Sequence, residues 1–122
     1  MDALTALTNA FSNGWAVTAL SAANTAGAAT KAGVARKTHY VTGYSVAVDV
    51  AANAAAIKQI TLKDGTTDIC TEVLAASAAV GTKISQNFPA PIKITTGAAC
   101  SINCPALDAT AKSRLNLFGY TI

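Results

Sequence analysis

The chain has 122 residues and a mass of 12.3 kDa, which is the size of one ordinary domain and leaves no room for a second hydrophobic core. Hydrophobic residues make up 52% and charged residues only 12%, so small polar residues and Ala must cover much of the surface. One His, six acidic residues and three Cys are a poor inventory for acid–base, metal or nucleophilic chemistry, which argues against an enzyme, a metal site or a cofactor.

The net charge of +3 is spread thinly along the chain. The closest basic cluster is Lys31, Arg36 and Lys37, without the interleaved aromatic residues that are typical of nucleic-acid binders, so we expect no nucleic-acid partner. Residues 1–15 lack the positive start of a secretory signal. Residues 16–35 contain too many polar side chains for a membrane span, so we expect no membrane partner.

Residues 1–35 contain no run rich in Val, Ile or aromatic residues, and we predict an extended or partly helical N-terminal arm there. Leu4, Leu7 and Phe11 recur at intervals of three and four, as on one face of a short helix. A helix this short is marginal unless it docks on another surface. Trp15 ends this part of the arm, and we favour a role as a plug in its own domain over a contact with a partner.

From Thr38 onward the pattern changes to the period of two that indicates a half-buried strand. His39 falls on the polar face of this strand, where we expect a surface residue. The opposite, apolar face is predicted to hold Tyr40, Tyr44, Val46, Val48 and Val50.

The clearest unit is a β-hairpin formed by residues 57–62 and 67–73. Asp64-Gly65 tolerates the positive φ angles of a two-residue turn. With this turn, Ile60 faces Ile69, and Cys70 falls on the side opposite the apolar face. That apolar face is predicted to consist of Ile60, Leu62, Ile69 and Val73.

The rest of the chain also reads as strands. Residues 72–80 fit either a short Ala-rich helix or the end of a strand followed by a loop, and we favour the second. Further strands are predicted at residues 83–88, 92–95, 99–104 and 112–122. The last of these stays apolar and bulky on both faces, which suits a central strand or one at a subunit interface. Short strands joined by turn residues predict an all-β fold, a β-sandwich or jelly roll of about eight strands over residues 36–122.

Cys100 and Cys104 lie four residues apart, about 13 Å in a strand, which exceeds the roughly 7 Å limit between the Cα atoms of a disulfide. We therefore predict that both pack in the core, and the odd total of three Cys favours free thiols. The sequence contains no nucleophile elbow and no phosphate-binding glycine loop. We accordingly predict no catalytic, cofactor-binding or metal-binding residue.

An Ala/Thr-rich arm, the hairpin Ile-Lys-Gln-Ile-Thr-Leu-Lys-Asp-Gly-Thr at 57–66 and the final strand Leu-Asn-Leu-Phe-Gly-Tyr-Thr-Ile at 115–122 resemble small virion proteins of tailed bacteriophages. The chain looks most like the jelly-roll decoration, or cement, proteins of the outer capsid, over roughly residues 38–122. The resemblance implies a homotrimer that binds the major capsid protein on the capsid exterior after assembly in the host cytoplasm. It implies neither catalysis nor a small-molecule substrate.

Two sets of contact residues follow from this interpretation. The candidate capsid contacts are Leu4, Leu7, Phe11, Trp15, Lys31, Arg36 and Lys37. The candidate subunit-interface residues are Tyr40, Tyr44, Phe118 and Tyr120. The alternative function is a receptor- or glycan-binding head of a phage tail or fibre, in which exposed tyrosines stack on sugar rings. For the tyrosines we favour core or subunit contacts.

Overall fold

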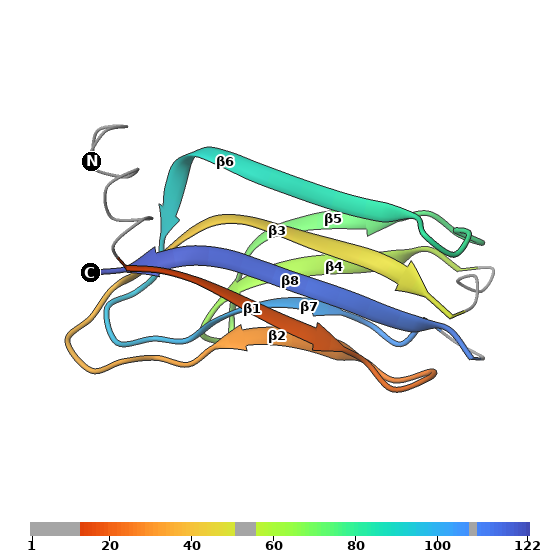
Figure 1. The fold of residues 1–122 in the computed structure, drawn as a ribbon, viewed down its shortest axis with the longest axis horizontal. Helices are drawn as coiled ribbons and strands as arrows, with labels where there is room; N and C mark the ends of the chain where they lie inside the picture. The colour runs from red at the N-terminus through yellow and green to blue at the C-terminus, as the bar shows by residue number, and fades with distance from the viewer. Residues whose placement is uncertain (1–12, 51–55, 108–109) are drawn as a thin grey trace.

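The computed structural model describes residues 13–50, 56–107 and 110–122, and within them the chain forms eight β-strands (Figure 1). They are β1 (Gly14–Leu20), β2 (Gly27–Lys31), β3 (His39–Asp49), β4 (Lys58–Asp64), β5 (Thr67–Leu74), β6 (Lys83–Lys93), β7 (Cys100–Cys104) and β8 (Lys112–Thr121). The described residues contain no helix long and apolar enough to span a bilayer.

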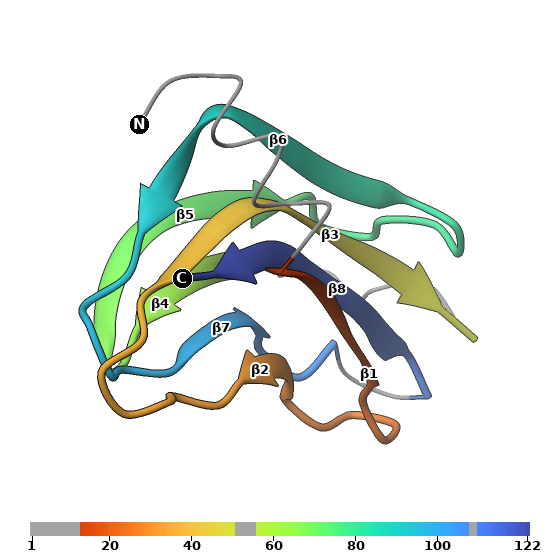
Figure 2. The same ribbon diagram turned by 60° about the vertical axis from the view of Figure 1, so that its left-hand side comes forward.

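The strands form two four-stranded antiparallel sheets that pack face to face (Figure 2). Sheet A has the order β1-β8-β3-β6, and sheet B has the order β2-β7-β4-β5. The first four strands therefore pair with the last four in reverse order, β1 with β8, β2 with β7, β3 with β6 and β4 with β5. A double ribbon wrapped in this way is a jelly roll, so the predicted fold is confirmed.

The core lies between the inner faces of the two sheets. Leu115 and Leu117 of β8 are fully buried there, as is Ile102 of β7. Burial of such a side chain contributes roughly 1.5–3 kcal/mol. Cys100 and Cys104 are 1% exposed and free, which confirms their predicted place in the core.

The predicted N-terminal arm is wrong over residues 14–31. This stretch forms β1, which pairs with β8 along its whole length, and β2, which pairs with β7. Ala29 of β2 belongs to the core. Local β-propensity is weak in β2, which consists mainly of Gly and Ala, and pairing with β7 overrides it. Leu4, Leu7 and Phe11 lie outside the described residues.

A β-bulge in β3 changes which side chains face the core. The register shifts between Val41 and Gly43. A regular alternation along β3 therefore assigns the side chains before the bulge to the wrong face of the sheet. Tyr44 faces the core, whereas Tyr40 lies on the outer face, and His39 is 1% exposed. The prediction of a surface histidine is therefore wrong.

The β4–β5 hairpin exists, but its register differs from the prediction. β4 ends at Asp64 and β5 begins at Thr67. A bulge between Leu62 and Lys63 shifts the pairing farther from the turn, so Ile60 faces Glu72 instead of Ile69. This shift inverts the faces of β5. Cys70 and Leu74 pack against the core, whereas Ile69 and Val73 are exposed.

The second half of the chain follows the prediction more closely. The predicted strands 83–88 and 92–95 form the single strand β6, which contains Pro89 and Pro91. This position suits proline because β6 is an edge strand of sheet A. Residues 75–82 form a loop, as favoured, and β8 is a central strand of sheet A.

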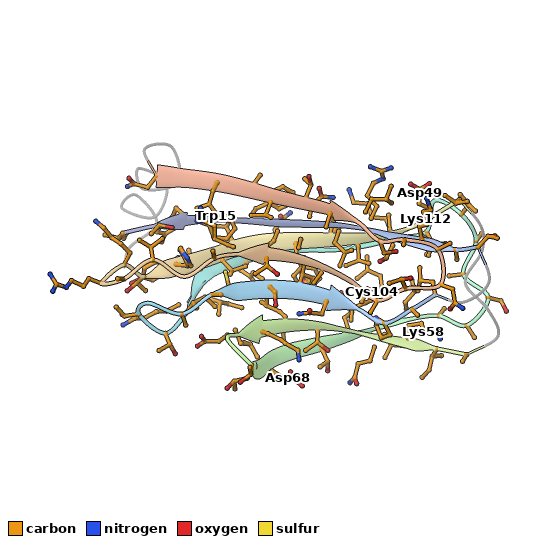
Figure 3. All side chains as sticks on the ribbon, turned by 90° about the horizontal axis from the view of Figure 1, so that it is seen from below. Trp15, Asp49, Lys58, Asp68, Cys104 and Lys112 are labelled. Carbon is orange, nitrogen blue, oxygen red and sulfur yellow. The ribbon has the colours of Figure 1, made fainter. Side chains whose placement is uncertain are left out.

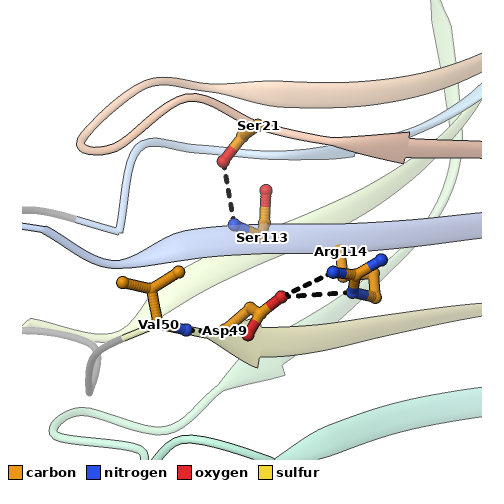
Figure 4. Close-up of polar contacts among 5 residues, drawn as sticks. All are labelled: Ser21, Asp49, Val50, Ser113 and Arg114. Carbon is orange, nitrogen blue, oxygen red and sulfur yellow. Dashed lines mark hydrogen bonds and ion pairs between the residues drawn. The ribbon is translucent and has the colours of Figure 1, made fainter.

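Polar contacts close the end of the sandwich where β1 and β3 finish (Figure 4). The Ser113 amide donates to the Ser21 hydroxyl at 2.8 Å. Arg114 donates to the Asp49 carboxylate from Nη2 at 2.8 Å and from Nε at 3.2 Å. These bonds, with a further one from the Val50 amide, lower the pKa of Asp49 below its usual range.

Candidate functional site

Within the described part of the chain, the end of the sandwich at which β1 begins and β2 finishes is open and holds a hollow of about 380 Å³, here called the Trp15 hollow. The described residues that line it are Asn13, Gly14, Trp15, Lys31, Val34, Lys37 and Thr121. Figure 3 shows Trp15 toward the end opposite Asp49, Lys58 and Lys112. Three of the predicted capsid contacts, Trp15, Lys31 and Lys37, thus come together from β1, from β2 and from the loop that precedes β3.

Trp15 is held firmly in this position. Its indole N–H donates to the Thr121 hydroxyl at 3.0 Å, and its ring meets that of His39 edge to face at 5.8 Å. Its six-membered ring lies on Gly119, where a Cβ atom would come within 2.6 Å of Trp15 Cζ2. Trp15 packs against the core of its own chain, which confirms that it serves as a plug, while part of the ring still borders the hollow.

His39 supports the site from beneath, a role that the sequence prediction missed. Its Nε2 lies 2.7 Å from the Ala32 carbonyl oxygen, and its Nδ1 lies 2.7 Å from the Thr121 hydroxyl. Because a carbonyl only accepts, Nε2 carries a proton. The Thr121 hydroxyl therefore joins His39 to Trp15 and ties β1, β3, β8 and the loop after β2 together.

The hollow is electropositive. The Lys31 ammonium group lies 5.6 Å from the centroid of the Trp15 ring, in cation–π distance. Lys37 lines the same hollow, and none of the described residues that line it is acidic. Within the described ranges neither lysine has an ion-pair partner. Arg36, the fourth predicted contact that the structure describes, is exposed beside Lys37 with a φ of 64° and does not line the hollow.

The predicted subunit-interface residues are not all at the surface. Tyr44 is 3% exposed in the core, and its phenol donates to Glu72 at 2.9 Å. Burial and this bond raise the pKa of Tyr44 above its usual range. Tyr120 is fully buried beneath Tyr40, with stacked rings 5.1 Å apart. Phe118 is 38% exposed, so Phe118 and part of Tyr40 remain available for contacts.

Two further hollows have volumes similar to that of the Trp15 hollow. One, of about 340 Å³, lies on the outer face of sheet B and carries the polar side chains of Gln59, Thr61, Lys63 and Asn103. The other, of about 400 Å³, lies beside Asp64, whose carboxylate accepts hydrogen bonds from Thr95. The described part of the chain contains no group of three or more His, Cys, Asp or Glu that could hold a metal ion.

No protein-family model and no curated protein matches the chain. Among solved structures, it is similar to the CBM36-1 domain of a multidomain xylanase from the hindgut metagenome of Trinervitermes trinervoides. The identity is 10%, the match covers 88% of this chain and 95% of that chain, and the TM-score is 0.40. The jelly-roll assignment rests on the strand pairing described above.

Proposed function

We propose that this protein is a non-catalytic virion structural protein, a decoration protein that binds the major capsid protein on the outer surface of a tailed-phage capsid. One observation carries the proposal. Trp15, Lys31 and Lys37, chosen as partner contacts from the sequence, lie around one hollow although they come from three separate segments. We place this hollow within the surface that meets the capsid.

The mechanism is mechanical. A protein that binds only the assembled shell opposes disassembly by mass action, by about 2.7 kcal/mol for each site when its concentration is 100 times Kd. The hydrogen bond and ring contacts that hold Trp15 reduce the entropy lost on docking, because the side chain is already ordered. Self-association as a trimer would use exposed aromatic surface, for which Phe118 and Tyr40 are the available residues.

Co-sedimentation tests this proposal. The purified chain is mixed with capsids assembled from the major capsid protein that is encoded with it, and the pellet is assayed. We expect saturable binding by the wild type and weaker binding by Lys31→Gln/Lys37→Gln. Lys83→Gln, which removes an exposed lysine at the start of β6, is the matched control. A folded wild-type chain that stays in the supernatant at every concentration would refute the decoration role.

A glycan-binding head is the second candidate. The hollow on the outer face of sheet B favours it, because the amides of Gln59 and Asn103 and the hydroxyl of Thr61 can exchange hydrogen bonds with sugar hydroxyls. The tyrosine platform imagined from the sequence does not support it, since Tyr44 and Tyr120 are buried. A saturable response on a glycan array that is lost in Asn103→Ala, with unchanged unfolding, would favour this function over capsid binding.

A further inference from the structure

We propose that the Trp15 hollow binds a carboxylate-bearing peptide segment, an acidic stretch of a partner protein. This inference deepens the proposed function, since it names the chemistry of the surface that the hollow would meet on the capsid. It concerns the described residues around the hollow and needs no contribution from residues 1–12.

The charges around the hollow carry the first step of the argument. Lys31 and Lys37 line it without ion-pair partners among the described residues, and Arg36 adds a third exposed cation next to them. The four acidic side chains that the structure describes are engaged elsewhere. Their partners are Arg114 for Asp49, Thr95 for Asp64, Lys63 for Asp68 and Tyr44 for Glu72. Among the described side chains, the positive charge of the hollow therefore has no acidic partner, and it can attract an external anion.

The shape of the hollow carries the second step. Trp15 of sheet A and Lys31 of sheet B face each other across the open end of the sandwich, and Val34, which is 45% exposed, adds apolar surface. The volume of about 380 Å³ lies at the low end of ligand sites. A glutamate side chain matches this lining, because its methylene groups can contact Val34 and the part of the indole that borders the hollow while its carboxylate reaches the lysines.

The position of Lys31 favours a peptide over a sugar. A saccharide would stack on a free indole face, but the Lys31 ammonium group lies over the Trp15 ring, and Gly119 and His39 pack against the same side chain. A sugar ring would have to displace Lys31, whereas a carboxylate pairs with it in place. A nucleic acid would engage a longer row of cations than these residues supply.

The test uses the fact that Trp15 is the single tryptophan of the chain, so its emission reports on the hollow itself. Decaglutamate is titrated into the full-length protein at low salt, with decaglutamine as the neutral control. Fluorescence anisotropy of a labelled decaglutamate gives a second readout that does not depend on the indole. We expect saturable binding of decaglutamate alone, weakened at least threefold by raising the salt to about 0.15 M.

Charge-removing variants locate the site. Lys31→Gln and Lys37→Gln should each weaken decaglutamate binding about threefold to tenfold, and Lys83→Gln should leave it unchanged. Equal binding of decaglutamine, or wild-type affinity in Lys31→Gln/Lys37→Gln, would overturn the inference. Lysine-dependent binding of hyaluronate or oligothymidylate in place of decaglutamate would also overturn it and would assign the site to an acidic glycan or a nucleic acid.

The capsid assay separates this inference from the proposed function. If the wild type binds capsids but not decaglutamate, the acidic-peptide site is wrong and the decoration role stands. If the wild type binds decaglutamate through its two lysines but no capsid, the site stands and the decoration role is wrong.

Discussion

Replacement of Thr121 by valine tests whether one hydroxyl holds the open end of the sandwich together. Valine keeps the shape of the side chain but removes the oxygen that accepts from Trp15 at 3.0 Å and contacts His39 Nδ1 at 2.7 Å. His39 is 1% exposed, so its unpaired nitrogen costs about 1–3 kcal/mol. Trp15 is half-buried, so its indole N–H can donate to water instead. Loss of its hydrogen bond to Thr121 should therefore cost only roughly 0.5–1 kcal/mol of stability. Together these two terms give an expected destabilisation of about 1.5–4 kcal/mol.

Urea unfolding followed by Trp15 emission measures this change, because the probe is part of the network. The midpoint should fall with no change in the m value, and the melting temperature should fall by roughly 10 °C. Thr30→Val, on the exposed side of β2, is the matched control and should change the free energy of unfolding by less than about 0.5 kcal/mol. If Thr121→Val is as stable as Thr30→Val, the hydroxyl does not join Trp15 to His39 as described.

Other predictions concern the glycine, thiol and tyrosine sites. Gly119→Ala should cost more than about 2 kcal/mol in urea unfolding, because the new Cβ meets the Tyr40 carbonyl and the Trp15 ring; an unchanged midpoint would contradict this. Burial raises the pKa of Cys100 and Cys104 to about 11, so neither should react with a thiol reagent at pH 8 until the chain unfolds. Tyr44 has a raised pKa when folded, so its contribution to stability should be complete below about pH 10 and decline above it. Tyr44→Phe should reduce the alkaline loss of stability without abolishing it, because burial also raises the pKa of Tyr120 and of the two core thiols; an identical pH profile would argue against a role for Tyr44.

The elements that the sequence predicted correctly are those with strong local signals. The Asp-Gly turn marked the β4–β5 hairpin, and alternating Val residues marked β3. The pairing register within these elements was predicted wrongly. A bulge adds one residue without a distinct sequence signature, and it moves every side chain beyond it to the opposite face of the sheet. The bulges near Val41 and Leu62 account for the misplaced His39 and Cys70. β2 was missed because its Gly and Ala residues have weak β-propensity, whereas β1 was missed although Trp15 and Val17 alternate as they do in a strand.

Some residues of the candidate site were predicted from the sequence, but their arrangement in space was not. Trp15, Lys31 and Lys37 stood out as the single indole and as members of the densest basic cluster, but their convergence depends on β1 and β2 lying in opposite sheets. His39 and Thr121 are 82 residues apart, and neither has a local motif that would reveal the hydrogen bond between them. Tyr44 looked like a possible interface residue, although its phenol serves Glu72 in the interior.

The pairing of β1 with β8 has a consequence for synthesis on the ribosome. β8 is the middle partner of β1 and β3, yet it is the last strand of the domain to be translated. Until β8 emerges, β1 and β3 have no strand between them. Trp15 also lacks its hydrogen-bond acceptor, the Thr121 hydroxyl, which lies 106 residues later in the chain. Sheet A therefore cannot close before β8 has been synthesised, and its formation requires long-range loop closure. Chains that lack β8 leave the facing edges of β1 and β3 unpaired, and unpaired edges of this kind favour aggregation until the sheet closes.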